Sequence, residues 1–198
     1  MAGRLIVVSG PSGVGKTTVC EALLGYPGFR RVVTATSRPP RPGERQGIDY
    51  HFLSEADFEA AQGRGEFLET AQVHGHLYGT PRKVVEEGLQ ENVWLLLNID
   101  VQGARQIRES ARKAPLPLQM VFLEPPNIEE LARRLRGRGT DGPESMEKRL
   151  KTALLELEER PQYDHVVVNN KVPATVKRIL KLIGYPGSGR KSTRSIRE

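Results

Sequence analysis

The stretch from Arg4 to Leu24 reads RLIVVSGPSGVGKTTVCEALL and decides the fold of this chain. Its first part, RLIVVS, is short, apolar and rich in β-branched residues, which is typical of a buried strand. A glycine-rich turn follows, and the segment from Lys16 to Leu24 is predicted to be a helix. A strand, a glycine loop and a helix in this order open an α/β fold with a phosphate-binding loop.

The glycine-rich turn matches the pattern G-x-x-x-x-G-K-[ST] in full, and it lies between a predicted strand and a predicted helix, as that pattern requires. The glycines let successive backbone N–H groups face one anion, and the helix adds its positive N-terminal end. Lys16 would bring a positive charge to the β- and γ-phosphates, and the Thr17 hydroxyl is a suitable Mg²⁺ ligand. The sequence therefore predicts a nucleoside triphosphate site with Mg²⁺, formed by Gly10, Pro11, Ser12, Gly13, Val14, Gly15, Lys16, Thr17 and Thr18.

Further along the chain, apolar strands continue to alternate with helices. Strands are predicted over 93–97, 118–123 and 165–168, and a helix is predicted over 102–113. This alternation favours an α/β protein whose parallel sheet is flanked by helices on both faces. The predicted P-loop NTPase core comprises residues 1–33, 81–126 and 162–186.

A polar segment over residues 34–80 interrupts this alternation. It is rich in Arg, Gly and Pro and contains short alternating runs such as IDYHF, which predicts a small inserted α+β lobe. Ser54 and Asp57 resemble a capping box for a short helix in this lobe. Thr80 followed by Pro81 predicts that Thr80 caps a helix whose first residue is the proline.

A second interruption covers residues 127–161. Asn127 and Glu130 form a plausible capping box for one helix. A turn rich in glycine and arginine follows, and a second helix is predicted to end at Arg160 because Pro161 cannot continue it. Two helices joined by such a turn suit a mobile lid, and a plain helical hairpin with solvated charges is an equally good interpretation of this segment alone.

The composition excludes several classes of protein. The chain has 198 residues, 37% of them hydrophobic, and no apolar run is long enough to span a membrane. It begins without the features of a secretory signal, and Cys20 is its sole cysteine, so we expect a cytoplasmic protein. The formal net charge is +6. Residues 187–198 carry half of this charge and are predicted to be a disordered tail, and nothing else in the sequence supports nucleic-acid binding.

The inserted lobe carries groups suited to a nucleoside monophosphate. Arg38 and Arg41, together with tyrosine hydroxyls further along the chain, could clamp a phosphate group. Glu69 could accept two N–H bonds from the edge of guanine, and adenine lacks this pair of donors. An ordinary polar loop is the alternative interpretation of the same residues.

From the phosphate-binding loop to about residue 183, the chain resembles the guanylate kinase family. The resemblance rests on the order and spacing of GPSGVGKTT (10–18), TSRPPRPGE (36–44), GIDYHF (47–52), YGT (78–80), NIDVQGA (98–104), RLRGRGT (134–140) and VN (168–169). It implies an enzyme that transfers the γ-phosphoryl group of ATP to GMP or dGMP, with Mg²⁺ as the cofactor and with ADP and GDP as products.

The resemblance also implies roles for individual residues. The GMP phosphate would be held by Arg38, Arg41, Tyr50 and Tyr78. The guanine would lie near Ser37, Glu69, Thr80 and Asp100, and Glu44 would brace the arginine-bearing loop. The transferring phosphoryl group would be surrounded by Lys16, Arg134, Arg138 and Arg149. Asn169 would lie near the adenine of ATP.

One residue departs from the family pattern. The family usually has aspartate at the first polar position after the hydrophobic strand, and this chain has Asn98. A neutral amide can hold a Mg²⁺-bound water but brings no charge, so we expect this residue to affect the rate without abolishing activity. The transfer itself needs no general base, because the acceptor phosphate, with a second pKa near ~6, is already ionised at neutral pH.

Three other functions remain possible from the sequence. The first is a guanylate-kinase-like interaction domain that has lost catalysis, which the complete loop and the arginines of the lid argue against. The second is a P-loop kinase with a different acceptor, which the segment from Ser37 to Glu44 and Glu69 argue against. The third is nucleic-acid binding through the basic tail. The sequence leaves monomer and homodimer both open.

Overall fold

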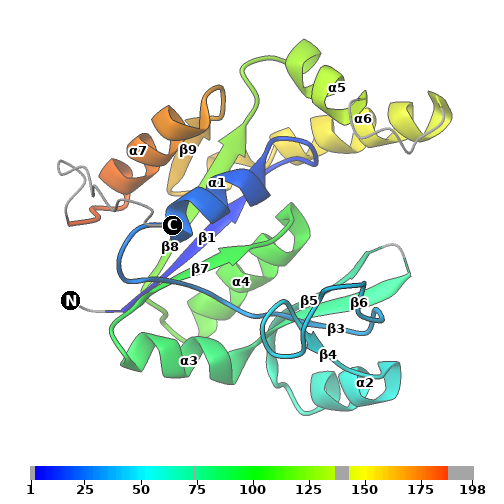
Figure 1. Ribbon diagram of the computed structural model, residues 1–198, viewed down its shortest axis with the longest axis vertical. Helices are drawn as coiled ribbons and strands as arrows, with labels where there is room; N and C mark the ends of the chain where they lie inside the picture. Colours follow the sequence, from blue (N-terminus) through cyan, green and yellow to red (C-terminus); the bar gives the residue numbers. More distant parts are fainter. Residues whose placement is uncertain (1–2, 74, 137–142, 187–198) are drawn as a thin grey trace. The chain divides into compact units, whose positions relative to one another are not determined.

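The computed structural model describes residues 3–73, 75–136 and 143–186, and side chains in this range except those of 143–147. The chain divides into two compact units (Figure 1). Unit 1 comprises residues 1–9 and 30–120, and unit 2 comprises residues 10–29 and 121–198. Each unit is described by itself.

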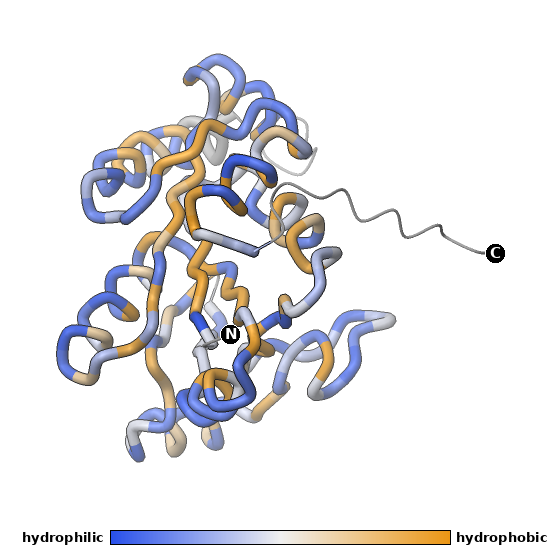
Figure 2. Tube along the Cα trace, turned by 90° about the vertical axis from the view of Figure 1, so that its left-hand side faces the viewer, coloured by the Kyte–Doolittle hydropathy of each residue, from blue (hydrophilic) through white to orange (hydrophobic). Residues whose placement is uncertain are grey.

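Unit 1 contains the parallel strands that follow from the opening apolar run. Strand β1 (Arg4–Ser9) pairs in parallel with β7 (Trp94–Asn98), and the strand order is β2-β7-β1, with β2 at Phe29–Arg31. Helix α3 (Arg82–Gln90) leads into β7, and α4 (Val101–Lys113) leaves it. The residues 5–8 and 94–97 are almost completely buried. Figure 2 shows the hydrophobic stretches of the chain in orange and the hydrophilic stretches in blue.

Unit 1 also contains a four-stranded sheet in the order β4-β3-β6-β5. Its strands are β3 (Ala35–Thr36), β4 (His51–Phe52), β5 (Phe67–Val73) and β6 (His76–Pro81). Helix α2 (Glu55–Gly63) precedes β5, and β5 and β6 form the antiparallel hairpin visible in Figure 1. These elements occur in the segment where the sequence predicts a small inserted α+β lobe.

Unit 2 begins with the glycine loop and α1 (Lys16–Leu24). Strand β8 (Leu118–Glu124), which belongs to this unit from Val121 onward, pairs in parallel with β9 (His165–Val168), with Val121 opposite His165. The other helices of the unit are α5 (Ile128–Arg136), α6 (Pro143–Leu157) and α7 (Val172–Leu182). Helices α5 and α6 pack together through Leu131, Leu135 and Ala153, so the predicted pair of helices is present.

Of the three predicted helix starts, two are confirmed and one is wrong. The backbone N–H of Asp57 donates to the Ser54 hydroxyl at 3.0 Å, so Ser54 caps α2 as predicted. The backbone N–H of Glu130 likewise donates to Asn127 Oδ1 at 2.8 Å at the start of α5. The prediction for Thr80 is wrong, because Thr80 lies buried in β6 and the residue at the cap of α3 is Pro81. The hydroxyl of Thr80 has a partner across the hairpin instead.

The predicted end of the second lid helix is also wrong by a few residues. Helix α6 ends at Leu157, and a short 3₁₀ helix over Arg160–Gln162 contains Pro161. The fixed φ of proline fits the first turn of such a helix, so Pro161 begins a turn where the sequence analysis placed it after a helix. Strand β2 was not predicted, because FRR has only one apolar residue.

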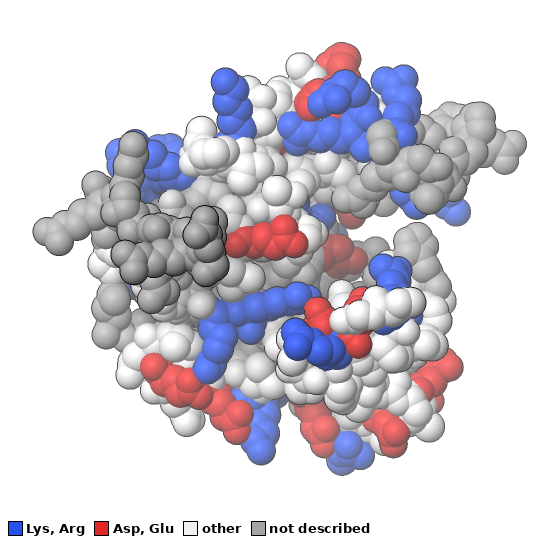
Figure 3. Space-filling view, in the orientation of Figure 1, with Lys and Arg blue, Asp and Glu red and all other residues white. Residues whose placement is uncertain are grey.

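Two further observations concern the hydropathy of the helices and the distribution of surface charge. Among the described residues, no helix is long and apolar enough to cross a lipid bilayer. On the face shown in Figure 3, basic and acidic side chains are interspersed. The basic side chains that the structure describes therefore do not form one continuous surface on that face.

Candidate active site

The glycine loop of unit 2 has the geometry of an anion-binding loop. Gly10, Gly13 and Gly15 have φ values of 139°, 82° and 97°, which disfavour any residue with a side chain. A Cβ atom at Gly10 would lie 2.2 Å from the carbonyl oxygen of Leu123. Gly15 stands at the start of α1 without a side-chain cap, so backbone N–H groups are presented at the positive end of the helix.

The Lys16 ammonium and one backbone N–H of the loop donate hydrogen bonds to oxygen atoms of the protein itself. The Lys16 ammonium donates to the carbonyl oxygens of Gly10 at 2.6 Å and Pro11 at 3.1 Å. The backbone N–H of Ser12 donates to a carboxylate oxygen of Glu156 from α6 at 3.2 Å. Thr17 and Thr18 are exposed in the first turn of α1. An N–H of this loop therefore points outward to an anionic oxygen.

Asn169 and Arg134 support the loop from the rest of unit 2. Asn169 is buried, and its amide donates to the carbonyl oxygen of Val14 at 2.8 Å and accepts from the Thr175 hydroxyl at 2.9 Å. The Arg134 guanidinium donates to the carbonyl oxygens of Val14 at 3.2 Å and Asn169 at 3.1 Å. Both side chains therefore hold the main chain of the loop at the same carbonyl group.

Glu130 orients Arg134 at this position. Its carboxylate accepts from Arg133 at 2.7 Å and from Arg134 at 2.8 Å. Arg133 first, and then Arg134, lower the pKa of Glu130 to about 2. The carboxylate therefore remains charged across the physiological range. Arg149, on α6, is partly buried, and Arg138 lies outside the described residues.

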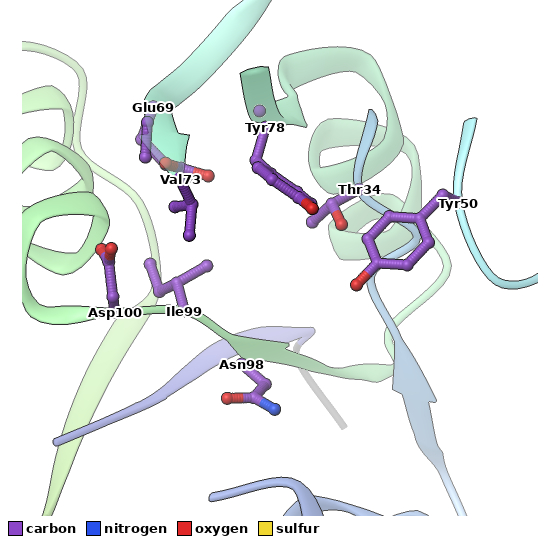
Figure 4. A pocket seen from close by; sticks show the side chains of 10 residues that line it. Thr34, Tyr50, Glu69, Val73, Tyr78, Asn98, Ile99 and Asp100 are labelled. Atoms are coloured by element: carbon purple, nitrogen blue, oxygen red, sulfur yellow. The ribbon is translucent and has the colours of Figure 1, made fainter. Parts of the chain in front are cut away.

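A pocket of about 220 Å³ lies in unit 1. Figure 4 shows the Glu69 and Asp100 carboxylates on one side of it and the Tyr50 and Tyr78 hydroxyls on the other. Its lining residues are Thr34, Tyr50, Glu69, Ala71, Val73, Tyr78, Gly79, Asn98, Ile99 and Asp100. Glu69, Ala71 and Val73 come from alternate positions of β5, which share one face of a strand. The pocket is therefore acidic at one end and phenolic at the other.

Glu69 is the only buried carboxylate among the described residues, with an exposed fraction of 5%. Thr80 lies opposite it in β6, and the Thr80 hydroxyl donates to Glu69 Oε1 at 2.6 Å. Burial raises the pKa of Glu69 to about 7, and the charge of Asp100 contributes in the same direction against the lowering effect of Thr80. The carboxyl is consequently poised between its charged and neutral forms near neutral pH.

Asp100 has a structural task as well as a place in the pocket. Its carboxylate accepts the backbone N–H of Gly103 at 2.8 Å and caps α4. The sequence analysis missed this cap, although an aspartate directly before the helical run is a usual signal for one. Asn98, at the end of β7, is exposed and lines the same pocket.

The arginine-bearing loop of unit 1 is braced internally. Two oxygens of Glu44 accept the Arg38 guanidinium at 2.9 Å each, and Glu44 also accepts the backbone N–H of Arg41 at 2.7 Å. The Arg38 contact first, and then the Arg41 N–H, hold the pKa of Glu44 below its usual value. The Arg38 guanidinium also lies over the ring of Tyr50, with its carbon 5.6 Å from the ring centroid.

The other residues predicted for the GMP site include two tyrosines, a serine and a second arginine. Tyr50 and Tyr78 have ring centroids 6.1 Å apart in an edge-to-face arrangement, next to Arg38. The Ser37 hydroxyl accepts the backbone N–H of Leu77 at 2.9 Å, and Arg41 is exposed. The pocket thus collects Tyr50, Tyr78, Glu69 and Asp100, whereas Ser37, Arg38, Arg41, Glu44 and Thr80 are not among its lining residues.

Comparison with known proteins places this geometry in a family. The family model described as "Guanylate kinase" matches residues 2–184. The chain belongs to the guanylate kinase family. A guanylate kinase from Streptomyces kasugaensis is 47% identical over 91% of this chain and 86% of its own length. One from Bifidobacterium longum is 49% identical over 86% of this chain and 88% of its own length.

A solved structure agrees with the sequence relatives. The crystal structure of guanylate kinase from Anaplasma phagocytophilum superposes with a TM-score of 0.72 at 35% identity, and it covers 92% of this chain and 85% of that one. The family, the α/β fold class and the enzyme class of nucleoside monophosphate kinases, all predicted from the sequence, are therefore confirmed. Guanylate kinases use ATP, and the phosphate-binding loop of this family member has the geometry described above.

Proposed function

We propose that this protein transfers the γ-phosphoryl group of ATP to GMP or dGMP. The observation that carries the choice of acceptor is Glu69, a buried carboxylate in a pocket that also contains tyrosine hydroxyls. An ionised Glu69 can accept the N1–H and the exocyclic amine of guanine. Adenine offers neither donor in this arrangement, so its binding would leave the buried carboxylate with Thr80 but without the two donors of the base.

The ATP site would be formed by residues 10–18 of unit 2. Phosphate oxygens would replace the Glu156 carboxylate at the Ser12 N–H, and Lys16 would turn from the loop carbonyls to the β- and γ-phosphates. Asn169 and Arg134 would keep the loop in shape through Val14. The expected place of Asn169 near the adenine remains a prediction.

The residues of the loop suit a Mg²⁺ ion that is bound mainly through the nucleotide. Thr17 presents a hard oxygen ligand in the exposed first turn of α1. Among the residues whose side chains the structure describes, no group of three or more His, Cys, Asp or Glu could hold a metal ion. Phosphates and water would therefore complete the coordination, and the ion would neutralise phosphate charge.

The acceptor phosphate would be bound at the other end of the unit 1 pocket. Tyr50 and Tyr78 offer hydroxyl groups there, and Arg38 and Arg41 offer cations. Glu44 fixes Arg38 with two hydrogen bonds and so reduces the entropy that Arg38 would lose on binding. Ser37, Thr80 and Asp100 would act near the guanine, the first two by holding strand β6 and the Glu69 carboxyl.

The chemistry then depends on positioning and positive charge. The GMP phosphate, with a second pKa near ~6, supplies an ionised nucleophile, so no side chain has to remove a proton. Lys16, Arg134, Arg138 and Arg149 would stabilise charge on the equatorial oxygens as transfer proceeds in line. Transfer requires that the donor held by unit 2 meets the acceptor held by unit 1, and closure of both inserted segments around the substrates remains a prediction. Cytoplasmic location and the oligomeric state also remain predictions.

The test is ADP production from ATP and Mg²⁺ with GMP, AMP, CMP or UMP supplied in turn. Strong turnover with GMP alone is the expected result. Glu69→Gln should lose selectivity for GMP, whereas Glu66→Gln, at an exposed carboxylate paired with Arg64, should not. Equal turnover of AMP would refute the role of Glu69. GMP binding without turnover would favour the non-catalytic interaction domain.

A further inference from the structure

Helix α4 presents three positions to strand β5. Gly103, Gln106 and Ser110 are spaced i, i+3 and i+7, which places them on one face of the helix. Strand β5 is the end strand in the order β4-β3-β6-β5, so one of its edges has no neighbouring strand within the part of the chain that the structure describes. Side chains of α4 supply hydrogen bonds along this edge.

Gln106 takes the place of a neighbouring strand at Thr70. Its Oε1 accepts the backbone N–H of Thr70 at 3.1 Å, and its Nε2 donates to the carbonyl oxygen of Thr70 at 2.7 Å. A strand partner makes the same pair of bonds with one residue of its neighbour. The Gln106 side chain therefore fixes both the N–H and the carbonyl group of Thr70.

Ser110 binds the main chain two residues earlier. Its hydroxyl donates to the carbonyl oxygen of Leu68 at 2.8 Å. The pairing of β5 with β6 shifts here, because Phe67 is opposite Pro81 while Glu69 is opposite Thr80. Leu68 is thus the extra residue of a β-bulge, a feature that redirects the following side chain. Both Leu68 and Glu69 are buried, which regular alternation along one strand would not allow with a single buried face.

Gly103 makes room for the side chain that this bulge redirects. A Cβ atom at position 103 would lie 2.8 Å from Glu69 Oε2 and 3.3 Å from its Cδ. The carboxyl of Glu69 therefore lies directly against the backbone of α4. One face of the helix holds the residue before Glu69, the residue after it and the space that its carboxyl occupies.

We propose that Gln106 and Ser110 are positioning residues for guanine selection, acting on Glu69 by fixing the main chain on both sides of it. The proposal rests on the role assigned above to Glu69. Neither side chain needs to touch the nucleotide. Their effect is on where the carboxylate stands, so it should fall on discrimination at the base and not on the use of ATP.

The experiment compares GMP with IMP as acceptors. IMP keeps the N1–H of guanine but lacks the exocyclic amine, so a well-placed carboxylate distinguishes the two and a displaced one does not. Gln106→Ala and Ser110→Ala should each lower the ratio of kcat/KM for GMP to kcat/KM for IMP, roughly tenfold for Gln106→Ala because two hydrogen bonds are lost. The KM for ATP should stay unchanged in both.

Conservative and control variants separate positioning from folding. Ser110→Thr keeps the hydroxyl and should retain the wild-type ratio. Gln62→Ala removes a bond to the same residue, but to the Thr70 side chain at 3.1 Å, and should leave the ratio unchanged. A variant that merely destabilises the fold would lower turnover of both acceptors together and leave the ratio as it was.

Each result has a definite meaning. Wild-type protein that prefers GMP, with selectivity lost in Gln106→Ala and retained in Ser110→Thr, supports the proposal. Wild-type protein that prefers GMP, with both alanine variants keeping that preference, overturns it and leaves the proposed function standing. Wild-type protein without turnover of GMP overturns both.

Discussion

The raised pKa of Glu69 predicts that this carboxyl makes the unliganded protein less stable as the pH rises. The folded protein holds the proton with a pKa of about 7, whereas the unfolded chain releases it near the ordinary value of 4.5. Between these two values the folded state binds more protons than the unfolded state, so the free energy of unfolding falls with increasing pH. The contribution is fully present below pH 4.5 and is lost above pH 7.

The size of the effect follows from the shift. One pKa unit corresponds to about 1.4 kcal/mol, so the full shift corresponds to about 3 kcal/mol, of which roughly 2–3 kcal/mol falls between pH 5 and pH 8. Glu69→Gln imitates the neutral carboxyl at every pH. The free energy of unfolding of Glu69→Gln minus that of wild type should therefore be roughly 2–3 kcal/mol larger at pH 8 than at pH 5.

The measurement is denaturant unfolding of wild type and Glu69→Gln at several pH values in this range. The difference between the two proteins removes the contributions of other groups. A difference that is constant with pH would refute the reasoning, because it would mean that the pKa of Glu69 is not raised. In Asp100→Asn, the pH range over which stability is lost should lie lower than in wild type. The substitution removes the like charge beside Glu69, while asparagine still caps α4.

Guanosine binding gives a second test of the raised pKa of Glu69. In the proposed complex, guanine would donate to the charged form of Glu69, so guanine binding should stabilise the protein more at pH 8 than at pH 6. Guanosine is the appropriate ligand, because the phosphate of GMP itself titrates with a pKa near ~6. Equal stabilisation of wild type by guanosine at both pH values would show that Glu69 does not bind the base.

Three further outcomes are expected. Lys16→Met should lower kcat by at least about 100-fold in the ADP assay, because a cation at the transferring group is lost. Gly10→Ala should lower the midpoint of thermal unfolding, because its Cβ would lie 2.2 Å from the carbonyl oxygen of Leu123. The expected loss in the free energy of unfolding is about 2 kcal/mol or more. Gly63→Ala, where a Cβ would meet no atom within 4 Å, is the matched control. Glu44→Gln should raise the KM for GMP roughly tenfold and leave the KM for ATP unchanged, because bonds to a charged guanidinium are weakened.

The phosphate-binding loop could be predicted from the sequence because its determinants are local. The glycines, Lys16 and Thr17 are contiguous, and each has a reason that depends only on its neighbours in the chain. The alternation of apolar strands with helices is also a local pattern, and it gave the correct fold class. The caps at Ser54 and Asn127 belong to the same kind of signal.

The errors and omissions concern residues whose partners are distant in the sequence. Thr80 followed by proline has the pattern of a helix cap, but its hydroxyl is bound by Glu69 on the neighbouring strand. Gln106 and Ser110 have no motif of their own, and their partners lie 36 and 42 residues away. The bulge at Leu68 likewise depends on the register with β6. Such contacts appear only when the sheet is assembled.

The charges of the pocket give a physical reason for the neutral residue at position 98. The pocket already contains Glu69 and Asp100, and the charge of Asp100 raises the pKa of Glu69. An aspartate in place of Asn98 would add a third carboxylate to the same lining and raise that pKa further. Less of Glu69 would then be ionised at neutral pH and able to accept the donors of guanine. The amide at position 98 therefore favours the ionised form of Glu69, the carboxylate that we propose accepts the donors of guanine.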